Sequence, residues 1–111
     1  MGAIYISTEI TRNNIKQETD NKITVIDFWA PWCGPCKIMD PVINQMEEKF
    51  ADNIHFGKMN VDGNEDIAEQ YKVMSMPSIV LFKNGKAVEK VTGIYSTKQM
   101  AHYLKRKLAE I

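Results

Sequence analysis

Apolar and polar residues alternate along the chain in stretches that predict strands and helices in turn. The segment AIYIS, residues 3–7, has the β-branched and aromatic content of a short strand. Residues 7–18 predict a modest helix capped by Ser7 or Thr8. KITVIDFWA, residues 22–30, predicts a central strand, because apolar side chains fill both of its faces. The chain is therefore expected to begin as a β-α-β unit.

The segment after this strand has the periodicity of an amphipathic helix. In CKIMDPVINQMEEKF, residues 36–50, apolar side chains recur at spacings of three and four. Pro41 lies inside this helix and should kink it, because proline lacks the backbone N–H that a helix uses. The next predicted elements are a strand at 53–62, a helix at 64–73 with Asn64 as N-cap, and strands at 78–82 and 87–92 joined by an Asn-Gly turn within 83–86.

A last helix is predicted from about Ser96, and its apolar residues share one side: Met100, Tyr103, Leu104, Leu108 and Ile111. The order of elements is thus β-α-β-α-β, a helix, a β-hairpin and a helix. Strands joined through a helix run parallel with a right-handed crossover, which places helices on both faces of the sheet. The sequence therefore predicts an α/β sandwich with a mixed sheet, formed by a single domain over residues 1–111.

Composition and charge narrow the range of functions. The 111 residues are 44% hydrophobic, enough for a real core, and 14 basic residues balance 14 acidic ones. This balance argues against a broad electrostatic contact with nucleic acid or an anionic membrane. The N-terminus lacks the pattern of a secretory signal, and no apolar run approaches the ~20 residues of a membrane span. We therefore expect a soluble protein of a reducing, cytoplasmic compartment.

The chain holds only two cysteines, in the segment Cys33-Gly34-Pro35-Cys36. A structural zinc site needs four ligands, and the only histidines, His55 and His102, lack zinc-finger spacing. A purely structural disulfide is a weaker alternative, because closing so short a loop removes little entropy from the unfolded chain. A C-x-x-C after a strand and at the start of a helix favours redox chemistry, and no metal or cofactor is expected.

The chemistry of thiol exchange explains this spacing. Only a thiolate attacks a disulfide, and a helix N-terminus stabilises a thiolate at Cys33 through its free N–H groups and dipole. Pro35 suits the first turn of that helix, where its missing N–H costs nothing. Cys36 lies one turn further on and should be more buried. The pattern therefore predicts that Cys33 attacks and Cys36 resolves the mixed disulfide.

Several motifs together resemble the thioredoxin family over nearly the whole chain. They are VIDFWAPWCGPCK, the helix proline Pro41, KMNVD, Pro77 ahead of an apolar strand, LFKNGK and Gly93. The resemblance implies a thioredoxin fold, a three-layer α/β/α sandwich whose four- or five-stranded mixed sheet is flanked by four helices. It also implies a monomeric protein-disulfide reductase that shuttles electrons through a Cys33–Cys36 disulfide.

The resemblance also assigns roles to individual residues. Asp27 would be the buried acid that assists proton transfer at Cys36, with Lys58 as its partner, and Pro77 would be a cis-proline facing the disulfide. Trp29 would pack beneath the loop. The expected substrate-binding residues are Trp32, Gly34, Pro35, Met76, Pro77, Gly93 and Ile94, with the Met76 backbone pairing with an extended substrate.

Strand parity gives independent support for two of these roles. Asp27 shares a strand face with Val25 and Trp29, so it should point into apolar surroundings that raise its pKa towards the range of a general acid–base. The alternatives are an outward carboxylate on a half-exposed strand and a buried polar group that the fold merely tolerates. Lys58 shares a face with Phe56, although a surface lysine with a buried stem is an alternative there. A trans bond is the ordinary case at Pro77, and only the resemblance favours cis.

Four positions depart from the commonest family pattern: Asp40, Ser78, Thr92 and Ile94. They leave the thiol chemistry untouched and bear on the choice of partners. The resemblance implies thioredoxin reductase as electron donor, and substrates such as ribonucleotide reductase, peroxiredoxins and methionine sulfoxide reductases. Two alternatives stay open at this point: an oxidase or isomerase domain, and a docking subunit without catalysis.

Overall fold

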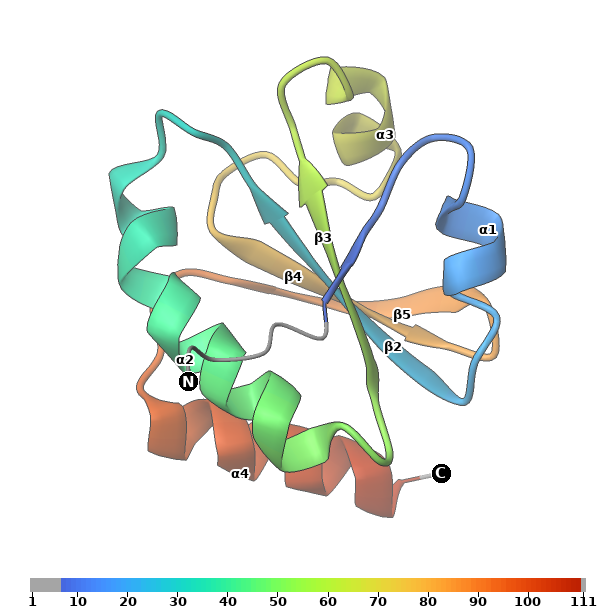
Figure 1. Ribbon diagram of the computed structural model, residues 1–111, viewed down its shortest axis with the longest axis vertical. Helices are drawn as coiled ribbons and strands as arrows, with labels where there is room; N and C mark the ends of the chain where they lie inside the picture. Colours follow the sequence, from blue (N-terminus) through green and yellow to red (C-terminus); the bar gives the residue numbers. More distant parts are fainter. Residues whose placement is uncertain (1–6, 111) are drawn as a thin grey trace, which may run out of the picture.

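The computed structural model describes residues 7–110, and within this range five strands form one mixed sheet in the order β1-β3-β2-β4-β5 (Figure 1). β1, β2 and β3 are parallel, whereas β4 runs antiparallel to β2, and β5 antiparallel to β4. This arrangement confirms the predicted mixed sheet. The strands are Thr8–Glu9 (β1), Ile23–Trp29 (β2), His55–Asn60 (β3), Ser78–Lys83 (β4) and Lys86–Thr92 (β5).

The helices within the same range cover both faces of the sheet. They are Ile15–Glu18 (α1), Gly34–Phe50 (α2), Glu65–Gln70 (α3) and Thr97–Ala109 (α4). One hydrophobic cluster joins α2 and α4 to one face of the sheet, through residues such as Val25, Met46 and Leu104. A second cluster joins α3 to the other face, with Ile15 of α1 against it. The three-layer sandwich is thereby confirmed.

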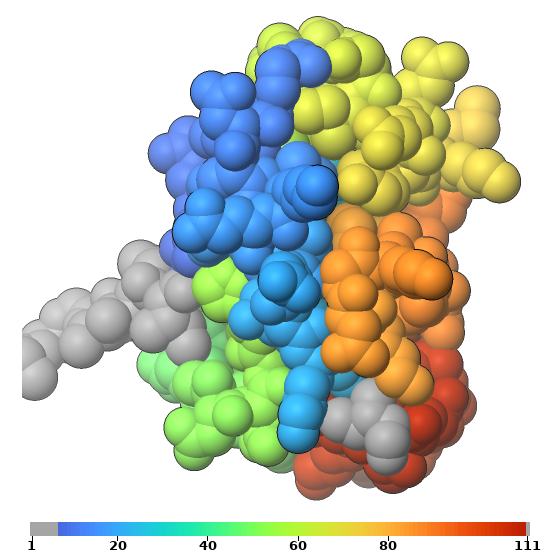
Figure 2. Space-filling view, turned by 90° about the vertical axis from the view of Figure 1, so that its right-hand side faces the viewer, coloured from blue at the N-terminus to red at the C-terminus, as the bar shows by residue number. Residues whose placement is uncertain are grey.

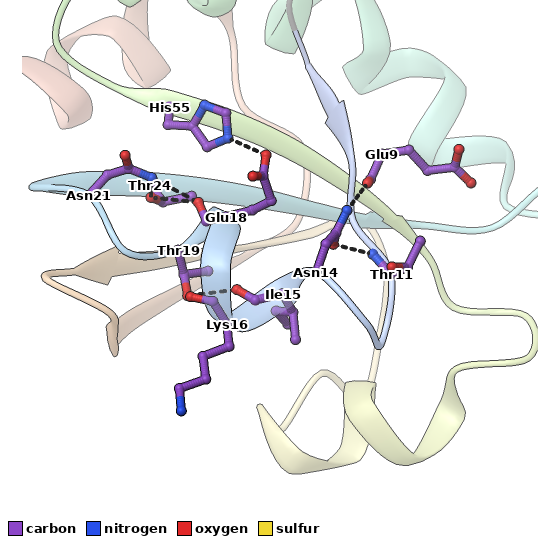
Figure 3. A network of polar contacts seen from close by, with 10 residues as sticks. All are labelled: Glu9, Thr11, Asn14, Ile15, Lys16, Glu18, Thr19, Asn21, Thr24 and His55. Carbon is purple, nitrogen blue, oxygen red and sulfur yellow. Dashed lines mark hydrogen bonds and ion pairs between the residues drawn. The ribbon is translucent and has the colours of Figure 1, made fainter.

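The first helix is shorter and begins later than predicted. Thr8, expected as a possible helix cap, instead pairs with Gly57 of β3, because a parallel ladder takes up the backbone of β1. The side chain of Asn14 bridges the turn that follows β1. It accepts a hydrogen bond from the Thr11 N–H (2.7 Å) and donates one to the Glu9 carbonyl (2.9 Å) (Figure 3). The helix predicted for residues 7–18 is therefore wrong over 7–14 and correct only over Ile15–Glu18. The strand predicted at 3–7 lies outside the described residues except for Ser7.

The remaining elements match their predictions, with shifted ends. α2 begins at Gly34, two residues earlier than predicted, and continues through Pro41. α3 ends at Gln70 because Lys72 adopts a positive φ of 60° and the Val73 N–H bonds back to the Ala68 carbonyl (2.8 Å). The Asn84-Gly85 turn has positive φ at both residues, as a tight hairpin requires. Ile111 of the last predicted helix is outside the described range.

The topology places the cysteine segment at one end of the sheet. β2 leads directly through Ala30 into the loop and the N-terminus of α2, at the upper left of Figure 1. The opposite end of the molecule carries the β4–β5 turn, drawn in orange in Figure 2, beside the blue region of β1, α1 and the start of β2. The β4–β5 turn and the cysteine segment therefore lie at opposite ends of the molecule.

Candidate active site

The two cysteines lie at the junction between β2 and α2, and they form a disulfide. Cys33 is the N-cap residue of α2, and Pro35 occupies the first turn. The backbone N–H of Cys36 donates a hydrogen bond to Cys33 Sγ over 3.1 Å. Once the disulfide is reduced, the same N–H and the positive end of the helix dipole are placed to stabilise negative charge on that sulfur.

Exposure does not separate the two cysteines in the disulfide form. Cys33 is 5% exposed and Cys36 is 4% exposed, so the difference in burial expected between them is too small to assign their roles. Hydrogen bonding does separate them, because it is Cys33 Sγ that caps the helix. Gly34 and Pro35, which lie between the cysteines in the first turn of α2, are exposed, so this turn faces solvent.

Asp27 lies inside the molecule, as strand parity predicted. It is 3% exposed and sits in register between Lys58 of β3 and Ile79 of β4. Burial raises its pKa to about 7, and the charges of Asp40 and Glu47 act in the same direction, whereas Lys58 opposes them. A carboxyl group with this pKa can both accept and donate a proton near neutral pH.

Lys58 is half-buried, which lies between the inward-facing lysine and the surface lysine that the sequence left open. Phe56 of the same strand and Ile54, just before the strand, belong to the core beneath α2 and α4. Because paired residues of parallel strands point to the same face, Lys58 and Asp27 share that face. The structure thus brings this predicted pair together.

The Met76–Pro77 peptide bond is cis, as the resemblance implied. A cavity of about 10 Å³ connects Asp27 with the cis-proline, and Gly93 and Met39 are among the residues that line it. The Gly93 N–H donates to the Pro77 carbonyl over 3.0 Å, which holds the two segments side by side. Asp27, Pro77 and Gly93 are therefore parts of one site, although they are far apart in the sequence.

Ser78 and Thr92, two of the positions that depart from the commonest family pattern, form a pair that the sequence did not predict. The hydroxyl groups of Ser78 and Thr92 are 2.8 Å apart, and Ser78 Oγ is also 2.7 Å from the Ser75 carbonyl. They are cross-strand partners on β4 and β5. Only the register of the two strands could have revealed that these two departures from the family pattern contact each other.

Exposed or half-buried apolar side chains occur on the segments that form the site. Trp32 is 68% exposed and Ile94 is 52% exposed, whereas Met76 is half-buried against the cysteines. Trp29 also packs against this cluster, as expected. The Trp32 indole N–H donates to Asp62 Oδ1 over 2.8 Å. Asp62 was not predicted to belong to the site, although it ends the KMNVD motif.

These features define a class of protein. A cysteine pair at the N-terminus of a helix, a buried acid of raised pKa behind it and a cis-proline beside it are the parts of a thiol–disulfide oxidoreductase. Within residues 7–110, no group of three or more His, Cys, Asp or Glu residues is arranged to hold a metal ion. No helix in that range is long and apolar enough to cross a membrane.

Comparison with known proteins identifies the family. The chain matches the family described as Thioredoxin over residues 5–106. It is 35% identical to Thioredoxin 1 of Synechococcus elongatus, covering 93% of this chain and 98% of that one, and 39% identical to thioredoxin of Bacillus subtilis, covering 75% and 80%. The structure of Malassezia sympodialis thioredoxin superposes with a TM-score of 0.82 at 34% identity, covering 95% and 94%. The chain belongs to the thioredoxin family.

Membership of this family establishes the activity. The chain is a thioredoxin-type disulfide reductase whose active-site cysteines are Cys33 and Cys36. As a thioredoxin it receives electrons from a reductase and passes them to protein disulfides.

Proposed function

We propose that Cys33 attacks the disulfide of a protein substrate and that Cys36 resolves the resulting mixed disulfide. The hydrogen bond from the Cys36 N–H to Cys33 Sγ carries this assignment. A sulfur atom at the N-cap gains most from the helix dipole and the free N–H groups, so its thiolate is the more stable of the two. Nucleophilic attack requires this thiolate.

Thiol exchange takes place in two steps, attack by Cys33 and resolution by Cys36. The Cys33 thiolate bonds to one substrate sulfur, the substrate S–S bond breaks, and the second substrate sulfur leaves as a thiolate. The thiol of Cys36 then loses its proton to Asp27, and its sulfur attacks Cys33 Sγ. The mixed disulfide breaks and the first substrate sulfur leaves. Two electrons have moved from the cysteine pair to the substrate.

Asp27 is proposed as the proton acceptor in the second step. Its burial raises its pKa to about 7, which brings its basicity closer to that of a thiol. Lys58, its partner in register on β3, would stabilise the carboxylate form once the proton has left.

The apolar surface around the disulfide is proposed as the docking site for protein substrates. It consists of Trp32, Gly34, Pro35, Met76, Gly93 and Ile94, together with Pro77, which is itself buried. The cis peptide bond between Met76 and Pro77 lies just before β4, where the Met76 backbone can pair with an extended segment of the partner. Rigid aromatic and flexible methionine side chains together suit varied partners.

The identities of the partners extend this proposal. Thioredoxin reductase would supply the electrons, and ribonucleotide reductase, peroxiredoxins and methionine sulfoxide reductases are the proposed substrates. The protein would act as a monomer in the cytoplasm.

Trapping tests the assignment of the two cysteines. The Cys36→Ser variant should accumulate substrate proteins bound through Cys33, because nothing resolves the mixed disulfide. Adducts would be recovered from cell extract, and the bonded cysteine would be mapped by mass spectrometry. Cys33→Ser is the matched control and should trap few partners. Comparable trapping by Cys33→Ser through Cys36 would contradict the proposed order.

A further variant separates reduction from simple docking. The Cys33→Ser, Cys36→Ser double variant should lose all disulfide reductase activity and its biological effect. Full retention of the biological effect would show instead that docking alone is sufficient.

A further inference from the structure

A short loop, residues 93–95, connects β5 to α4 and carries Gly93 and Ile94, two of the residues proposed to contact substrates (Figure 1). We call it the docking loop. Gly93 adopts a positive φ of 112°, and the side chain of Ile94 is 52% exposed. An exposed loop binds a partner more tightly when its conformation is already fixed before binding. The contacts that fix this loop therefore bear on substrate affinity.

Helix α2 holds one end of the docking loop. The Tyr95 N–H donates a hydrogen bond to Met39 Sδ over 3.3 Å. Met39 is buried in the core between the sheet and the helices, and it lines the same cavity as Asp27, Pro77 and Gly93. A thioether sulfur is a weak acceptor, whereas a leucine side chain offers no acceptor at all. This sulfur therefore attaches the loop to the helix whose first turn carries the disulfide.

A chain of hydroxyl groups holds the other end of the docking loop. Ser78 Oγ donates to the Ser75 carbonyl over 2.7 Å, and it lies 2.8 Å from Thr92 Oγ1. A hydroxyl group has a single proton, so Ser78 accepts from Thr92, whose hydroxyl is the donor. Ser75 and Ser78 lie on either side of the cis peptide bond between Met76 and Pro77. Thr92, the residue before the loop, is thus attached to the cis-proline segment.

Two backbone carbonyl groups complete the attachment of the docking loop. The Gly93 N–H donates to the Pro77 carbonyl over 3.0 Å, and the Tyr95 hydroxyl donates to the Thr92 carbonyl over 3.2 Å. Directly after the loop, Ser96 caps the N-terminus of α4. The exposed side chain of the loop is therefore carried by a backbone that is held on both sides, by α2 and by the cis-proline segment.

We propose that Met39 and Thr92 are positioning residues, which hold the docking loop beside the disulfide and thereby raise the affinity for protein substrates. Met39 acts through the backbone of Tyr95, and Thr92 acts through the hydroxyl of Ser78. The inference deepens the proposed docking site and rests on it. It gives a function to Thr92 and Ser78, which both depart from the commonest family pattern.

Comparison of a protein disulfide with a small disulfide tests this inference. Fully reduced protein is mixed either with insulin, whose disulfides belong to a folded protein, or with hydroxyethyl disulfide, which is too small to reach the docking loop. The second-order rate constant for oxidation of the cysteine pair is measured with each substrate by alkylating the thiols that remain. The ratio of the two rate constants reports docking, because thiol exchange itself is common to both reactions.

Two variants each remove one contact of the docking loop. Met39→Leu removes the sulfur acceptor, and Thr92→Val removes the hydroxyl donor. Each should lower the ratio of the insulin rate constant to the small-disulfide rate constant by roughly two- to tenfold, because a substrate binds only the molecules whose loop is in place. Met46→Leu makes the same change further along α2, and Thr24→Val removes a buried hydroxyl at the far end of β2. Both of these controls should keep the parent ratio.

The Ile94→Ala variant distinguishes failure of this inference from failure of the proposed docking site. If Ile94→Ala keeps the parent ratio, the loop does not dock substrates, and the inference falls together with that part of the docking site. If Ile94→Ala lowers the ratio but Met39→Leu or Thr92→Val does not, the docking site stands and the positioning role of the residue concerned is overturned. A parallel fall of both rate constants would also overturn it, because a general disturbance of the disulfide affects large and small substrates alike.

Discussion

At the scale of single residues, the site depends on an acid that the fold keeps away from water. Asp27 is flanked in sequence by Ile26 and Phe28, which are both fully buried on the opposite face of the sheet. Its own side chain points to the face that α2 and α4 cover, and Asp27 is 3% exposed there. Burial therefore raises the pKa of Asp27, and the raised pKa lowers the folding stability by an amount that can be measured.

Replacing this acid should stabilise the protein at neutral pH. The pKa of Asp27 rises from an ordinary 3.8 to about 7 on folding, so between these values the folded state binds a proton that the unfolded state does not. The stability of the parent protein therefore falls as pH rises through this window. Asp27→Asn does not lose stability in this way. Its free energy of unfolding should exceed that of the parent protein by up to about 4 kcal/mol above pH 7 and by little near pH 4. Urea unfolding of the disulfide forms at several pH values measures it.

The control for this prediction is Asp20→Asn, which removes an exposed carboxylate after α1. It should change the stability by less than about 0.5 kcal/mol at any of these pH values. A gain for Asp27→Asn that is equal at pH 4 and pH 8 would show that packing, and not ionisation, is responsible.

At the scale of elements, β1 is positioned by a close approach to β3. Gly57 of β3 pairs with Thr8 of β1 on one side and Ile26 of β2 on the other. A Cβ atom at Gly57 would lie 2.6 Å from Ile10 Cδ1 and 3.3 Å from the Thr8 carbonyl oxygen. Glycine at this position therefore leaves room for the side chain of Ile10 to lie directly over the strand.

Gly57→Ala should therefore destabilise the protein by about 1–3 kcal/mol, the usual cost of overpacking a core. The midpoint of urea unfolding would show the loss. In an Ile10→Ala background the same substitution should cost clearly less, because the colliding side chain is gone. An equal cost in both backgrounds would contradict the proposed contact with Ile10.

At the scale of the whole molecule, the fold decides how readily the cysteine pair gives up electrons. Gly34 and Pro35 contain no titratable group, so the thiolate of Cys33 relies on the helix N-terminus and the Cys36 N–H. A thiolate that receives no further stabilisation leaves the disulfide comparatively stable and the dithiol a good donor. Thioredoxins as a family have a reduction potential near about −270 mV, and we expect this member to share it.

Equilibration with glutathione measures this potential, and a value above about −200 mV, in the range of isomerases, would contradict the reductant role. Pro35→His should raise the potential by about 30 mV or more, because an imidazolium beside Cys33 stabilises the thiolate and hence the reduced form. Pro35→Ala removes the ring without adding charge and is the control for that variant.

The elements with strong periodicity could be predicted from the sequence, and the weak ones could not. β2, α2 and α4 each carry a regular apolar pattern, and each is found within a few residues of its predicted position. The segment before α1 has no such pattern, and pairing with β3 overrode its local helical preference. The end of α3 depended on a positive φ at Lys72, a residue type that gives no sign of it.

The sequence by itself determined that thiol exchange is the chemistry these cysteines favour, because Cys33 and Cys36 lie at a strand–helix junction, and it determined that Asp27 points inward, through strand parity. Only the tertiary structure decided what surrounds them. It joined Ser78 to Thr92, brought Pro77 and Gly93 to the cavity at Asp27, and set Glu47 inside the core. The physical reason is that local patterns encode which face a residue takes, whereas contacts between distant segments depend on strand register and helix placement.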